Sequence, residues 1–472
     1  MRRMNVVVVG AGPAGVMAAQ RAAELGASVT LVTRDRFGGM AAHDGPIPVR
    51  TLAHAAWMVR EARSLSRYGI AGALPEVDYA KLLSRVREVV SEVGLHSGLR
   101  RTLEQSGVAV HENAGTVAFT EPHVLRGQRG PRLQTDRVVL CTGGLPRRLD
   151  VPGAELALSH SAAWSLTAVP ASMIVIGGGM TGLQVASIFQ AFGSKVQLFQ
   201  SGPRILSGED EEVSRAVAQG LRADGMVVEE GFGTIERFDP VPDGTRMTYG
   251  KDGTRGSAEA AVVISAVGWG ADTEGLNLPG AGIELDVKGF VKVDAHLRTT
   301  APHVFAAGDV IGGSMIVPPA ILDAHVAATN AVQGATLLRA TSLVPIGGFT
   351  WPEYARAGLT ETAARASHDI VVGLVRFDET ARTIIDGHTA GFCKLIAERT
   401  TRRILGCHVV GERAAEIVQA VAIAMGGDMR VDTLARTPLA FPTYAGMLSR
   451  AAYRVTRAID PEFQAPEHLT GI

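Results

Sequence analysis

Apolar and polar positions divide this chain into two similar alternating stretches and a different tail. Apolar runs at 6–9 and 173–176 are each followed by glycine and then by a small-residue stretch with helical spacing. Such short runs are typical of buried parallel strands that lead into helices. Elsewhere in the two stretches the pattern predicts strands over 28–32, 137–141, 195–199 and 261–268, and helices over 14–25 and 51–91. This alternation predicts an α/β fold.

The rest of the chain follows other patterns. The turn-rich segment 231–258 predicts a small antiparallel sheet, and 304–309 predicts a strand that ends in a Gly-Asp corner before a helix over 319–338. The tail predicts strands over 370–377, 392–398 and 404–410, a helix over 414–425, and a loose end over the last dozen residues, which contain Pro461 and Pro466. We expect this tail to be an α+β module without a phosphate loop of its own.

Both apolar runs open into the same glycine motif. The first run precedes Gly10, Gly12 and Gly15, and the second precedes Gly177, Gly179 and Gly182. In a strand–turn–helix context, this spacing lets backbone amides at a helix N-terminus hold a pyrophosphate. Two such units predict two dinucleotides, and a flavin and a nicotinamide cofactor that exchange a hydride explain them most simply.

Composition narrows the class of protein. A length of 472 residues predicts roughly two to four domains. The net charge of −1, with acids and bases interspersed, gives no reason to expect nucleic acid or an anionic membrane as a partner. No apolar run is long enough to span a membrane, and Cys141, Cys393 and Cys407 form no C-x-x-C. We expect a cytoplasmic protein with reduced core cysteines and no metal site.

Further motifs carry a resemblance to a known family. They are Phe305-Ala306-Ala307-Gly308-Asp309-Val310, Phe349-Thr350-Trp351-Pro352-Glu353, Gly358-Leu359-Thr360-Glu361 and Ile404-Leu405-Gly406. From residue 4 to about 458 the chain resembles the pyridine nucleotide–disulfide oxidoreductases, which include dihydrolipoamide dehydrogenase, glutathione reductase and mercuric reductase. The resemblance implies an α/β protein with two Rossmann-like domains and an α+β dimerisation domain. The implied boundaries are 1–150 and 271–342 for the FAD-binding domain, 151–270 for the NAD(P)-binding domain, and 343–472 for the domain that forms a homodimer.

The resemblance also implies which residues hold the cofactors. The first glycine motif would take the pyrophosphate of FAD, and the second that of NAD(P)H. Asp309 would form a hydrogen bond with the ribityl or phosphate region of FAD. The other residues that we expect at the two cofactor sites are Thr33, Arg34, Gly39, Thr142, Gly143, Gly308, Ala320, Gln200 and Gly268.

The ends of the second strands bear on the choice of cofactor. An acidic residue usually holds the adenosine ribose there, but this chain has Thr33 in the first unit and Gln200 in the second. Thr33 still offers a hydrogen bond, so we expect FAD to bind, more loosely than usual. The neutral side chain of Gln200 neither repels the 2′-phosphate of NADPH nor strongly binds the free 2′-hydroxyl of NADH. Arg204 either reaches a phosphate or, as is more common, has a structural role, and NADPH is slightly favoured.

Two departures from the family pattern concern disulfide chemistry. The redox segment of the family carries two cysteines, and this chain has Ala41 and Pro46 at those positions. Since disulfide exchange requires a thiolate, the alignment excludes disulfide reductase activity. The C-terminal His–Glu pair of the family is replaced by Phe441 and Gly446, and a phenyl ring carries no proton. The losses agree, because without thiols that histidine has nothing to titrate.

A third departure changes the charge expected beside the flavin. The Lys–Glu pair of the family is replaced by Arg50 and Gln184, which turns a neutral pair into a net charge of +1. At ~7 Å and an effective dielectric constant of ~20, this charge is worth roughly 2 kcal/mol. We expect it to favour the anionic reduced flavin and to raise the flavin potential. The alternative is an arginine that is simply bonded to the backbone or to a cofactor phosphate.

Other side chains have two interpretations each. His43 and Asp44 lie on the loop that replaces the disulfide, and either supply a new acid–base pair or, as we favour, form a solvated or capping pair. Phe441 either covers the flavin or an acceptor pocket, or packs in an interface. Tyr444 is a less favoured hydrogen-bond donor to an acceptor, and Trp269 is a candidate to line the nicotinamide entry.

Together these features predict a FAD-dependent NAD(P)H oxidoreductase without a redox-active disulfide. Hydride transfer between two stacked rings needs neither thiols nor the histidine pair. The reduced flavin is therefore expected to act directly on a quinone-type or other small oxidant. The open alternatives are a soluble NAD(P) transhydrogenase, a biosynthetic flavoenzyme and a non-catalytic FAD-binding sensor. The segment 411–417 resembles the C-terminal region of the soluble transhydrogenases. The catalytic candidates are Arg50, Gln184, Phe441 and His43.

Overall fold

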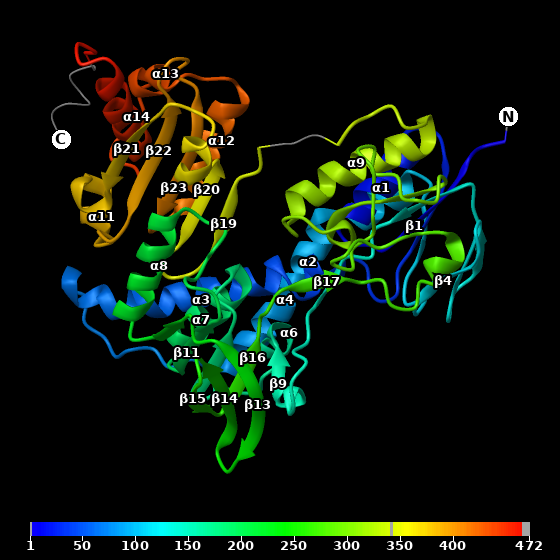
Figure 1. The fold of residues 1–472 in the computed structure, drawn as a ribbon, viewed down its shortest axis with the longest axis horizontal. Coiled ribbons are helices and arrows are strands. Elements are labelled where there is room, and N and C mark those ends of the chain that lie inside the picture. Colours follow the sequence, from blue (N-terminus) through cyan, green and yellow to red (C-terminus); the bar gives the residue numbers. More distant parts are fainter. Residues whose placement is uncertain (1, 340–342, 465–472) are drawn as a thin grey trace. The chain divides into compact units, whose positions relative to one another are not determined.

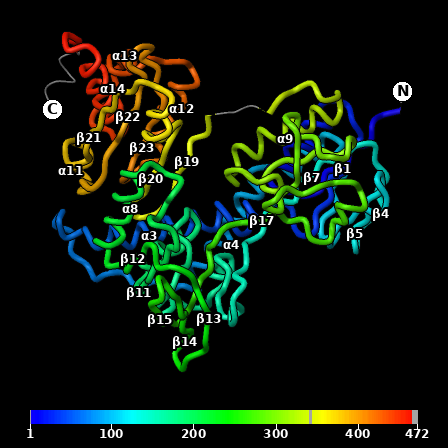
Figure 2. Tube along the Cα trace, in the orientation of Figure 1, coloured from blue at the N-terminus to red at the C-terminus, as the bar shows by residue number. Residues whose placement is uncertain are grey.

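The computed structural model describes residues 2–339 and 343–464. The chain divides into two compact units, each built from separated segments. Unit 1 comprises Met1–Leu52, Asp78–Arg147 and Gly268–Ser342, and unit 2 comprises Ala53–Val77, Arg148–Val267 and Leu343–Ile472. Figures 1 and 2 trace the chain through these segments.

The core of unit 1 is a five-stranded parallel sheet in the order β18-β7-β1-β2-β3. Its strands are β1 (Asn5–Val9), β2 (Ser28–Val32), β3 (Ala109–His111), β7 (Arg137–Leu140) and β18 (Val304–Ala306). On one face lie α1 (Pro13–Glu24), α5 (Leu99–Gln105) and α9 (Val317–Gln333), with α1 and α9 side by side (Figure 1). The other face packs on β4 (Val117–Glu121) and β5 (Val124–Gly127). Burial on both faces explains why the strands are continuous apolar runs.

Unit 2 contains a second parallel sheet and a separate antiparallel one. The parallel sheet has the order β12-β11-β10-β16-β9, with β9 (Ala157–Ser159), β10 (Ser172–Ile176), β11 (Lys195–Gln200), β12 (Val227–Glu230) and β16 (Val262–Ser265). The C-terminal sheet has the order β19-β20-β23-β22-β21, with β19 (Ile346–Gly348), β20 (Tyr354–Gly358), β21 (Ile370–Arg376), β22 (Phe392–Glu398) and β23 (Ile404–Val410). Helices α12 (Ala414–Gly426) and α14 (Gly446–Ile459) pack on this sheet and bury a large apolar core.

The described chain contains further helices and strands outside the three five-stranded sheets and the helices named above. The helices are α2 (Gly39–His43), α3 (Pro46–Ser64), α4 (Tyr79–Ser97), α6 (His160–Ala163), α7 (Met180–Ala191), α8 (Glu211–Ala223), α10 (Glu361–Arg365), α11 (Ala381–Asp386) and α13 (Val431–Arg436). The strands are β6 (Arg132–Gln134), β8 (Gly144–Pro146), β13 (Thr234–Val241), β14 (Gly244–Lys251), β15 (Thr254–Ala260) and β17 (Trp269–Ala271).

Most of the predicted strands are confirmed. The bounds of β2, β22 and β23 are those predicted, and β13, β14 and β15 form the small antiparallel sheet expected at 231–258. The strand predicted over 261–268 is shorter, because only its apolar centre pairs with β10.

The single helix predicted over 51–91 is wrong. Helix α3 ends at Ser64, and α4 begins only at Tyr79. Gly69 has a φ of 73°, a left-handed conformation that commonly ends a helix. A new helix begins where the side chain of Asp78 accepts a hydrogen bond from the Lys81 amide at 3.0 Å, as an N-cap does.

Two other helices differ from prediction. The helix expected over 319–338 spans Val317–Gln333, because Gly334 has a φ of 91° and leaves the helical conformation. In the tail, the helix predicted over 414–425 is confirmed as α12 (Ala414–Gly426), whereas α14 (Gly446–Ile459) was not predicted. Most of the expected loose end, over 465–472, lies outside the described residues.

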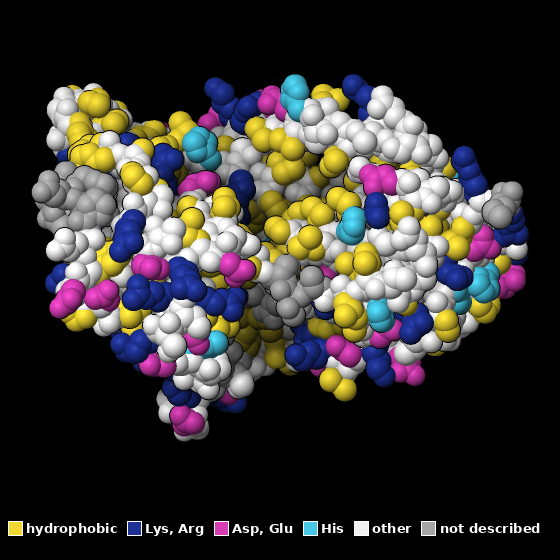
Figure 3. Space-filling view, turned by 90° about the horizontal axis from the view of Figure 1, so that it is seen from above, with side chains coloured by type: hydrophobic (Ala, Val, Ile, Leu, Met, Phe, Trp, Pro, Cys, Tyr) yellow, Lys and Arg dark blue, Asp and Glu magenta, His cyan; other side chains and the backbone are white. Residues whose placement is uncertain are grey.

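The charge on the surface and the apolar character of the helices can be compared with the expectation that neither nucleic acid nor a membrane is a partner. On the face drawn in Figure 3, basic and acidic side chains are interspersed, as expected from a net charge of −1. Among the residues described, none of the helices combines the length and apolar character needed to cross a bilayer.

Candidate functional site

The three glycines of the first motif have three different surroundings. Gly10 has a φ of 106°, and a Cβ there would lie 2.2 Å from the carbonyl oxygen of Cys141. A Cβ on Gly15 would lie 1.8 Å from the carbonyl oxygen of Gly10. Gly12 is the N-cap of α1, and a Cβ on it would meet nothing within 4 Å. The outer two glycines therefore allow the tight turn and the helix packing, while Gly12 leaves room for a pyrophosphate.

The second motif repeats this arrangement in unit 2. Gly177 has a φ of 107°, and a Cβ there would lie 2.4 Å from the carbonyl oxygen of Ala266. A Cβ on Gly182 would lie 1.9 Å from the carbonyl oxygen of Gly177. Gly179 is the N-cap of α7 and, like Gly12, faces open space. Both motifs thus have a backbone cradle that fits a dinucleotide pyrophosphate.

The Gly-Asp corner follows β18 and borders the first motif. Gly308 has a φ of 78°, and a Cβ there would lie 3.1 Å from Ala14 Cβ and 3.5 Å from Ala320 Cβ. The carboxylate of Asp309 makes no hydrogen bond or ion pair within the part of the chain that the structure describes. Burial raises the pKa of Asp309. A half-buried acceptor without a protein partner fits the hydroxyl groups of a ribityl chain.

Three more predicted residues lie beside this corner and the first motif. A Cβ on Gly39 would lie 2.8 Å from the Cα atom of Gly12. The hydroxyl of Thr142 donates to the carbonyl oxygen of Asp272 at 2.7 Å. Gly143 has a φ of 86°, and a Cβ there would meet nothing within 4 Å. Backbone therefore approaches backbone closely here and leaves open space next to it.

The residues after β2 are held partly by the protein itself. Thr33 is buried, and its amide donates to the carbonyl oxygen of His111 at 2.9 Å. The guanidinium of Arg34 pairs with Asp35 and with Asp272, each at 3.0 Å. Burial raises the pKa of Asp272, against the lowering effect of Arg34. Direct contacts of Thr33 and Arg34 with a cofactor stay predictions.

The residues after β11 support one of the two interpretations of Arg204. The side-chain oxygen of Gln200 accepts a hydrogen bond from the Gly178 amide at 2.8 Å. The guanidinium of Arg204 donates to three carbonyl oxygens of the segment 206–209, at 2.9 to 3.2 Å. Its donors are therefore used within the loop, which favours the structural role over contact with a 2′-phosphate.

Comparisons with known proteins agree with this geometry. Residues 4–330 match the model of the pyridine nucleotide-disulphide oxidoreductase family, and residues 344–452 match that of its dimerisation domain. The chain belongs to this family.

Relatives cover almost the whole chain. A dihydrolipoyl dehydrogenase of Bacillus subtilis is 30% identical over 458 residues, which are 95% of this chain and 98% of the relative. A dihydrolipoyl dehydrogenase of Halobacterium salinarum is 31% identical over 459 residues, 95% of each chain. An HOCl-induced flavoprotein disulfide reductase of Escherichia coli, RclA, has the same fold, with a TM-score of 0.84 at 24% identity over 96% of this chain and 100% of that one. FAD and NAD(P)H are the cofactors of the family.

The segment predicted to replace the disulfide loop of the family spans α2 and the start of α3. Ala41 lies within α2, and Pro46 begins α3. The ring nitrogen Nε2 of His43 lies 2.8 Å from the carbonyl oxygen of Phe37, and the Asp44 amide donates to the carbonyl oxygen of Met40. These contacts favour the local structural role of His43 and Asp44 over an acid–base role.

The two residues of the predicted Arg50–Gln184 pair belong to different units. Arg50 lies on α3 in unit 1, and Gln184 lies on α7 in unit 2. The amide nitrogen of Gln184 donates to the carbonyl oxygen of Met180 at 3.2 Å. The pairing of Arg50 with Gln184 stays a prediction.

The aromatic candidates differ in what surrounds them. Phe441 is 67% exposed, as a residue available to a cofactor or to a second subunit would be. Tyr444 is buried instead, and its hydroxyl donates to Asp386 at 3.1 Å, so the hydroxyl is used within the domain and not offered to an acceptor. Trp269 is half-buried on β17, and its carbonyl oxygen accepts from Arg147 at 2.7 Å. Gly268, which precedes it, has a φ of 106°.

Two ion-paired arrangements were missed by the sequence analysis. Asp272 holds Arg34 across 238 positions in the chain, and no local pattern reveals such a pair. Lys394 is buried in β22 and bonded to three carboxylates. A lysine in the strand 392–398, which is apolar apart from this residue and the terminal Glu398, was the available signal for this cluster.

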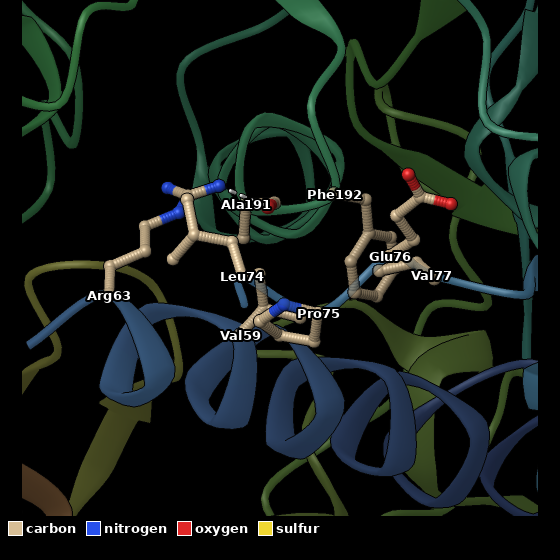
Figure 4. A pocket seen from close by; sticks show the side chains of 8 residues that line it. All are labelled: Val59, Arg63, Leu74, Pro75, Glu76, Val77, Ala191 and Phe192. Carbon is tan, nitrogen blue, oxygen red and sulfur yellow. Dashed lines mark hydrogen bonds between the residues drawn. The ribbon is translucent and has the colours of Figure 1, made fainter. Parts of the chain in front are cut away.

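A pocket of about 330 Å³ lies in unit 2. It is lined by Val59, Arg63, Leu74, Pro75, Glu76, Val77, Ala191 and Phe192 (Figure 4). One wall is closed by a hydrogen bond from Arg63 to the carbonyl oxygen of Ala191 at 2.8 Å. None of the predicted cofactor or catalytic residues lines this pocket.

Proposed function

We propose that this protein passes a hydride from NAD(P)H to FAD and from the reduced flavin directly to a quinone-type or other small non-disulfide oxidant. NAD(P)H gives up two electrons and a proton as a hydride, and a quinone takes up two electrons and two protons, the second from solvent. NADPH is slightly favoured, because Gln200 carries no charge that would repel a 2′-phosphate.

The observation that carries this proposal is the absence of an available thiolate. We place Ala41 and Pro46 at the two redox positions of the family. Cys141, Cys393 and Cys407 are all free and buried. Burial raises the pKa of Cys141 to about 12, and the Cys393 thiol and burial raise that of Cys407. Since disulfide exchange needs an accessible thiolate, these thiols do not replace the missing pair.

The chain's own residues support binding of both cofactors. Amides at the N-termini of α1 and α7 would hold the two pyrophosphates, with Gly12 and Gly179 leaving the space for them. Asp309 would accept hydrogen bonds from the flavin side. The bound flavin would supply the hydride chemistry, and the protein would orient the two rings and exclude water.

We also propose a homodimer formed through residues 343–472. The match to the family's dimerisation domain supports it. Large apolar side chains of this region are exposed in the single chain, among them Ile384, Ile385, Ile423 and Phe441. Exposed apolar groups of this kind are typical of a surface that a second subunit covers.

A second candidate is a soluble NAD(P) transhydrogenase, in which the acceptor is another nicotinamide. It is favoured by Phe441, which puts an aromatic ring in place of the family histidine, and by the segment 411–417. The two candidates share the first half-reaction and differ only in the acceptor.

An anaerobic titration with NADH and with NADPH, monitored by flavin absorbance, tests the proposal. We expect bleaching of the flavin without the thiolate-to-flavin charge-transfer band of disulfide reductases. Turnover with a soluble quinone is then compared with turnover of a nicotinamide analogue and of lipoamide. Flavin that neither donor reduces would overturn the oxidoreductase proposal, and rapid turnover of lipoamide would overturn the assignment of the acceptor.

The charge beside the flavin gives a further prediction. The double variant Arg50→Lys plus Gln184→Glu restores the neutral pair of the family. Loss of one positive charge, worth roughly 2 kcal/mol, is expected to lower the two-electron midpoint potential of the flavin by about 40 mV. Spectroelectrochemical titration of the double variant and of each single variant measures the shift. An unmoved midpoint contradicts the expected effect of this charge.

A further inference from the structure

A buried ionic cluster in unit 2 joins the start of α8 to the C-terminal sheet. Lys394 on β22 is only 1% exposed. Its ammonium nitrogen has three carboxylate partners: Asp210 at 2.9 Å, Glu212 at 2.9 Å and Glu361 at 2.6 Å. Asp210 is 3% exposed. Charges so far from water are stable only when their partners hold them in a fixed geometry, so the cluster fixes Asp210 against β22.

Asp210 is also the last residue of segment 201–210, which connects β11 to α8. It caps α8, because its side chain accepts a hydrogen bond from the Glu212 amide at 3.2 Å. Glu209, the residue before it, pairs with Arg356 of β20 at 2.8 Å. Two consecutive acidic residues are therefore anchored to two strands of the dimerisation domain.

The middle of segment 201–210, at Ile205 and Leu206, lies on the second glycine motif. The Leu206 amide donates to the carbonyl oxygen of Gly178 at 2.8 Å. A Cβ on Gly178 would lie 2.6 Å from Ile205 Cγ2, so Ile205 packs directly on this glycine. The Gly178 amide in turn donates to Gln200. Segment 201–210 therefore touches both the glycine turn and the residue expected at the adenosine ribose.

Between Ile205 and Asp210 the segment is held by several hydrogen bonds. Arg204 bonds to three of its carbonyl oxygens. The hydroxyl of Ser214, in the first turn of α8, donates to the carbonyl oxygen of Ile205 at 2.7 Å. A displacement at Glu209 or Asp210 would therefore be passed to Ile205 and Gly178 through a continuous set of hydrogen bonds and packed atoms.

We propose that Lys394 and Arg356 are positioning residues for the second dinucleotide site. They hold Asp210 and Glu209, and thereby set the place of segment 201–210 against the pyrophosphate and adenosine-ribose end of that site. The two cations act through the segment and need no contact with the dinucleotide. This inference rests on the proposed function, in which the second motif binds NAD(P)H. It makes the dimerisation domain a determinant of nicotinamide-cofactor affinity within one chain.

Binding of ADP-ribose tests the proposal without any reaction, since this probe carries the adenosine and pyrophosphate of NADH but no nicotinamide. Calorimetric titration of the FAD-loaded protein compares the wild type with Asp210→Asn, which keeps a good capping residue and removes the charge. The matched control is Asp432→Asn. Asp432 lies in the first turn of α13 and pairs with Arg402 at 3.2 Å, a partner outside the Lys394 cluster.

We expect Asp210→Asn to bind ADP-ribose about tenfold more weakly than the wild type, a typical coupling between sites. Asp432→Asn is expected to bind within about twofold of the wild type, with the FAD content of both variants unchanged. Wild-type affinity in Asp210→Asn would overturn the positioning role and leave the proposed function intact. A wild-type protein that binds neither ADP-ribose nor NAD(P)H would overturn the second dinucleotide site, and both proposals with it.

If Asp210→Asn does not fold, Glu209→Gln tests the positioning role instead. This substitution removes only the ion pair between Glu209 and Arg356. Weaker ADP-ribose binding and a raised KM for NAD(P)H at unchanged kcat would support the positioning role, since loss of uniform binding affects KM alone. An unchanged affinity and an unchanged KM in this variant would overturn it.

Discussion

Gly179→Val is expected to give a folded, FAD-loaded protein that neither NADH nor NADPH reduces. The backbone at Gly179 has φ −85° and ψ −179°, a conformation open to any L-residue. A Cβ there meets no atom within 4 Å, so the substitution costs the fold little. It fills the space that the pyrophosphate would enter. We expect NAD(P)H affinity to fall by at least about a hundredfold, roughly 3 kcal/mol, in an anaerobic titration followed by flavin absorbance.

Gly12→Val is the corresponding control in the first glycine motif. Gly12 has φ −76° and ψ −175°, and a Cβ on it also meets open space. This variant is expected to be purified without FAD while it still binds ADP-ribose. Gly179→Val should therefore keep FAD and lose NAD(P)H binding, whereas Gly12→Val should lose FAD and keep binding at the second motif. Reduction of Gly179→Val by NADH at the wild-type affinity would contradict the assignment of the second motif.

The second large effect is expected from Lys394→Met. Removal of the ammonium leaves Asp210 buried and without its cation, and loss of one partner of a buried ion pair typically costs about 3–5 kcal/mol. Urea unfolding followed by circular dichroism measures the free energy of unfolding. The matched control is Lys292→Met, because Lys292 pairs with Glu284 at 3.2 Å with both side chains exposed. We expect the control to lose less than about 1 kcal/mol.

The stability difference between Lys394→Met and the wild type should depend on pH. Burial alone would raise the pKa of Asp210, yet the Glu361 amide and the Lys394 ammonium hold it below its ordinary value. The pKa of Glu361 is lowered against the effect of burial in the same way, by Lys394 and Arg365. In the wild type their contribution is present above the ordinary carboxyl pKa and is lost as the pH falls through the lowered, folded values.

In Lys394→Met, the carboxylates of Asp210 and Glu361 have lost the Lys394 ammonium. Protonation of these carboxylates therefore removes their uncompensated negative charge. The difference in unfolding free energy between wild type and variant should therefore shrink when the pH is lowered from about 7 to below about 4. An equal difference at both pH values, or a variant as stable as Lys292→Met, would show that the cluster does not stabilise the fold electrostatically.

The parallel sheets could be predicted because strands buried on both faces are continuous apolar runs. Strands β1 and β10 each pair with a parallel strand on both edges, and both are continuous apolar runs after their first residue. The break between α3 and α4 could not be predicted from periodicity, because apolar spacing continues through the left-handed turn at Gly69. A 3-10 turn over Leu65–Tyr68, capped by Gly69, and the N-cap at Asp78 mark the two ends of the break.

The candidate site could be predicted where it is local in sequence. The glycine motifs are contiguous, and each glycine has the surroundings that its place in the motif implies. The partners of Arg34 and Lys394 could not be predicted, because Asp272 and Asp210 reach them only through the tertiary fold. A charged residue in or directly after an apolar strand signals that a partner exists, but the identity of the partner depends on long-range packing.

The burial of Cys141, Cys393 and Cys407 has a consequence for how this protein would respond to electrophiles. Alkylating agents and mild thiol oxidants attack exposed thiolates, and such a group is not present among the described cysteines, which are all of the cysteines in the chain. If the flavin is oxidised directly by its acceptor, the catalytic cycle contains no step that these reagents block. The protein would then keep oxidising nicotinamide cofactors under chemical stress that inactivates thiol-dependent members of its family.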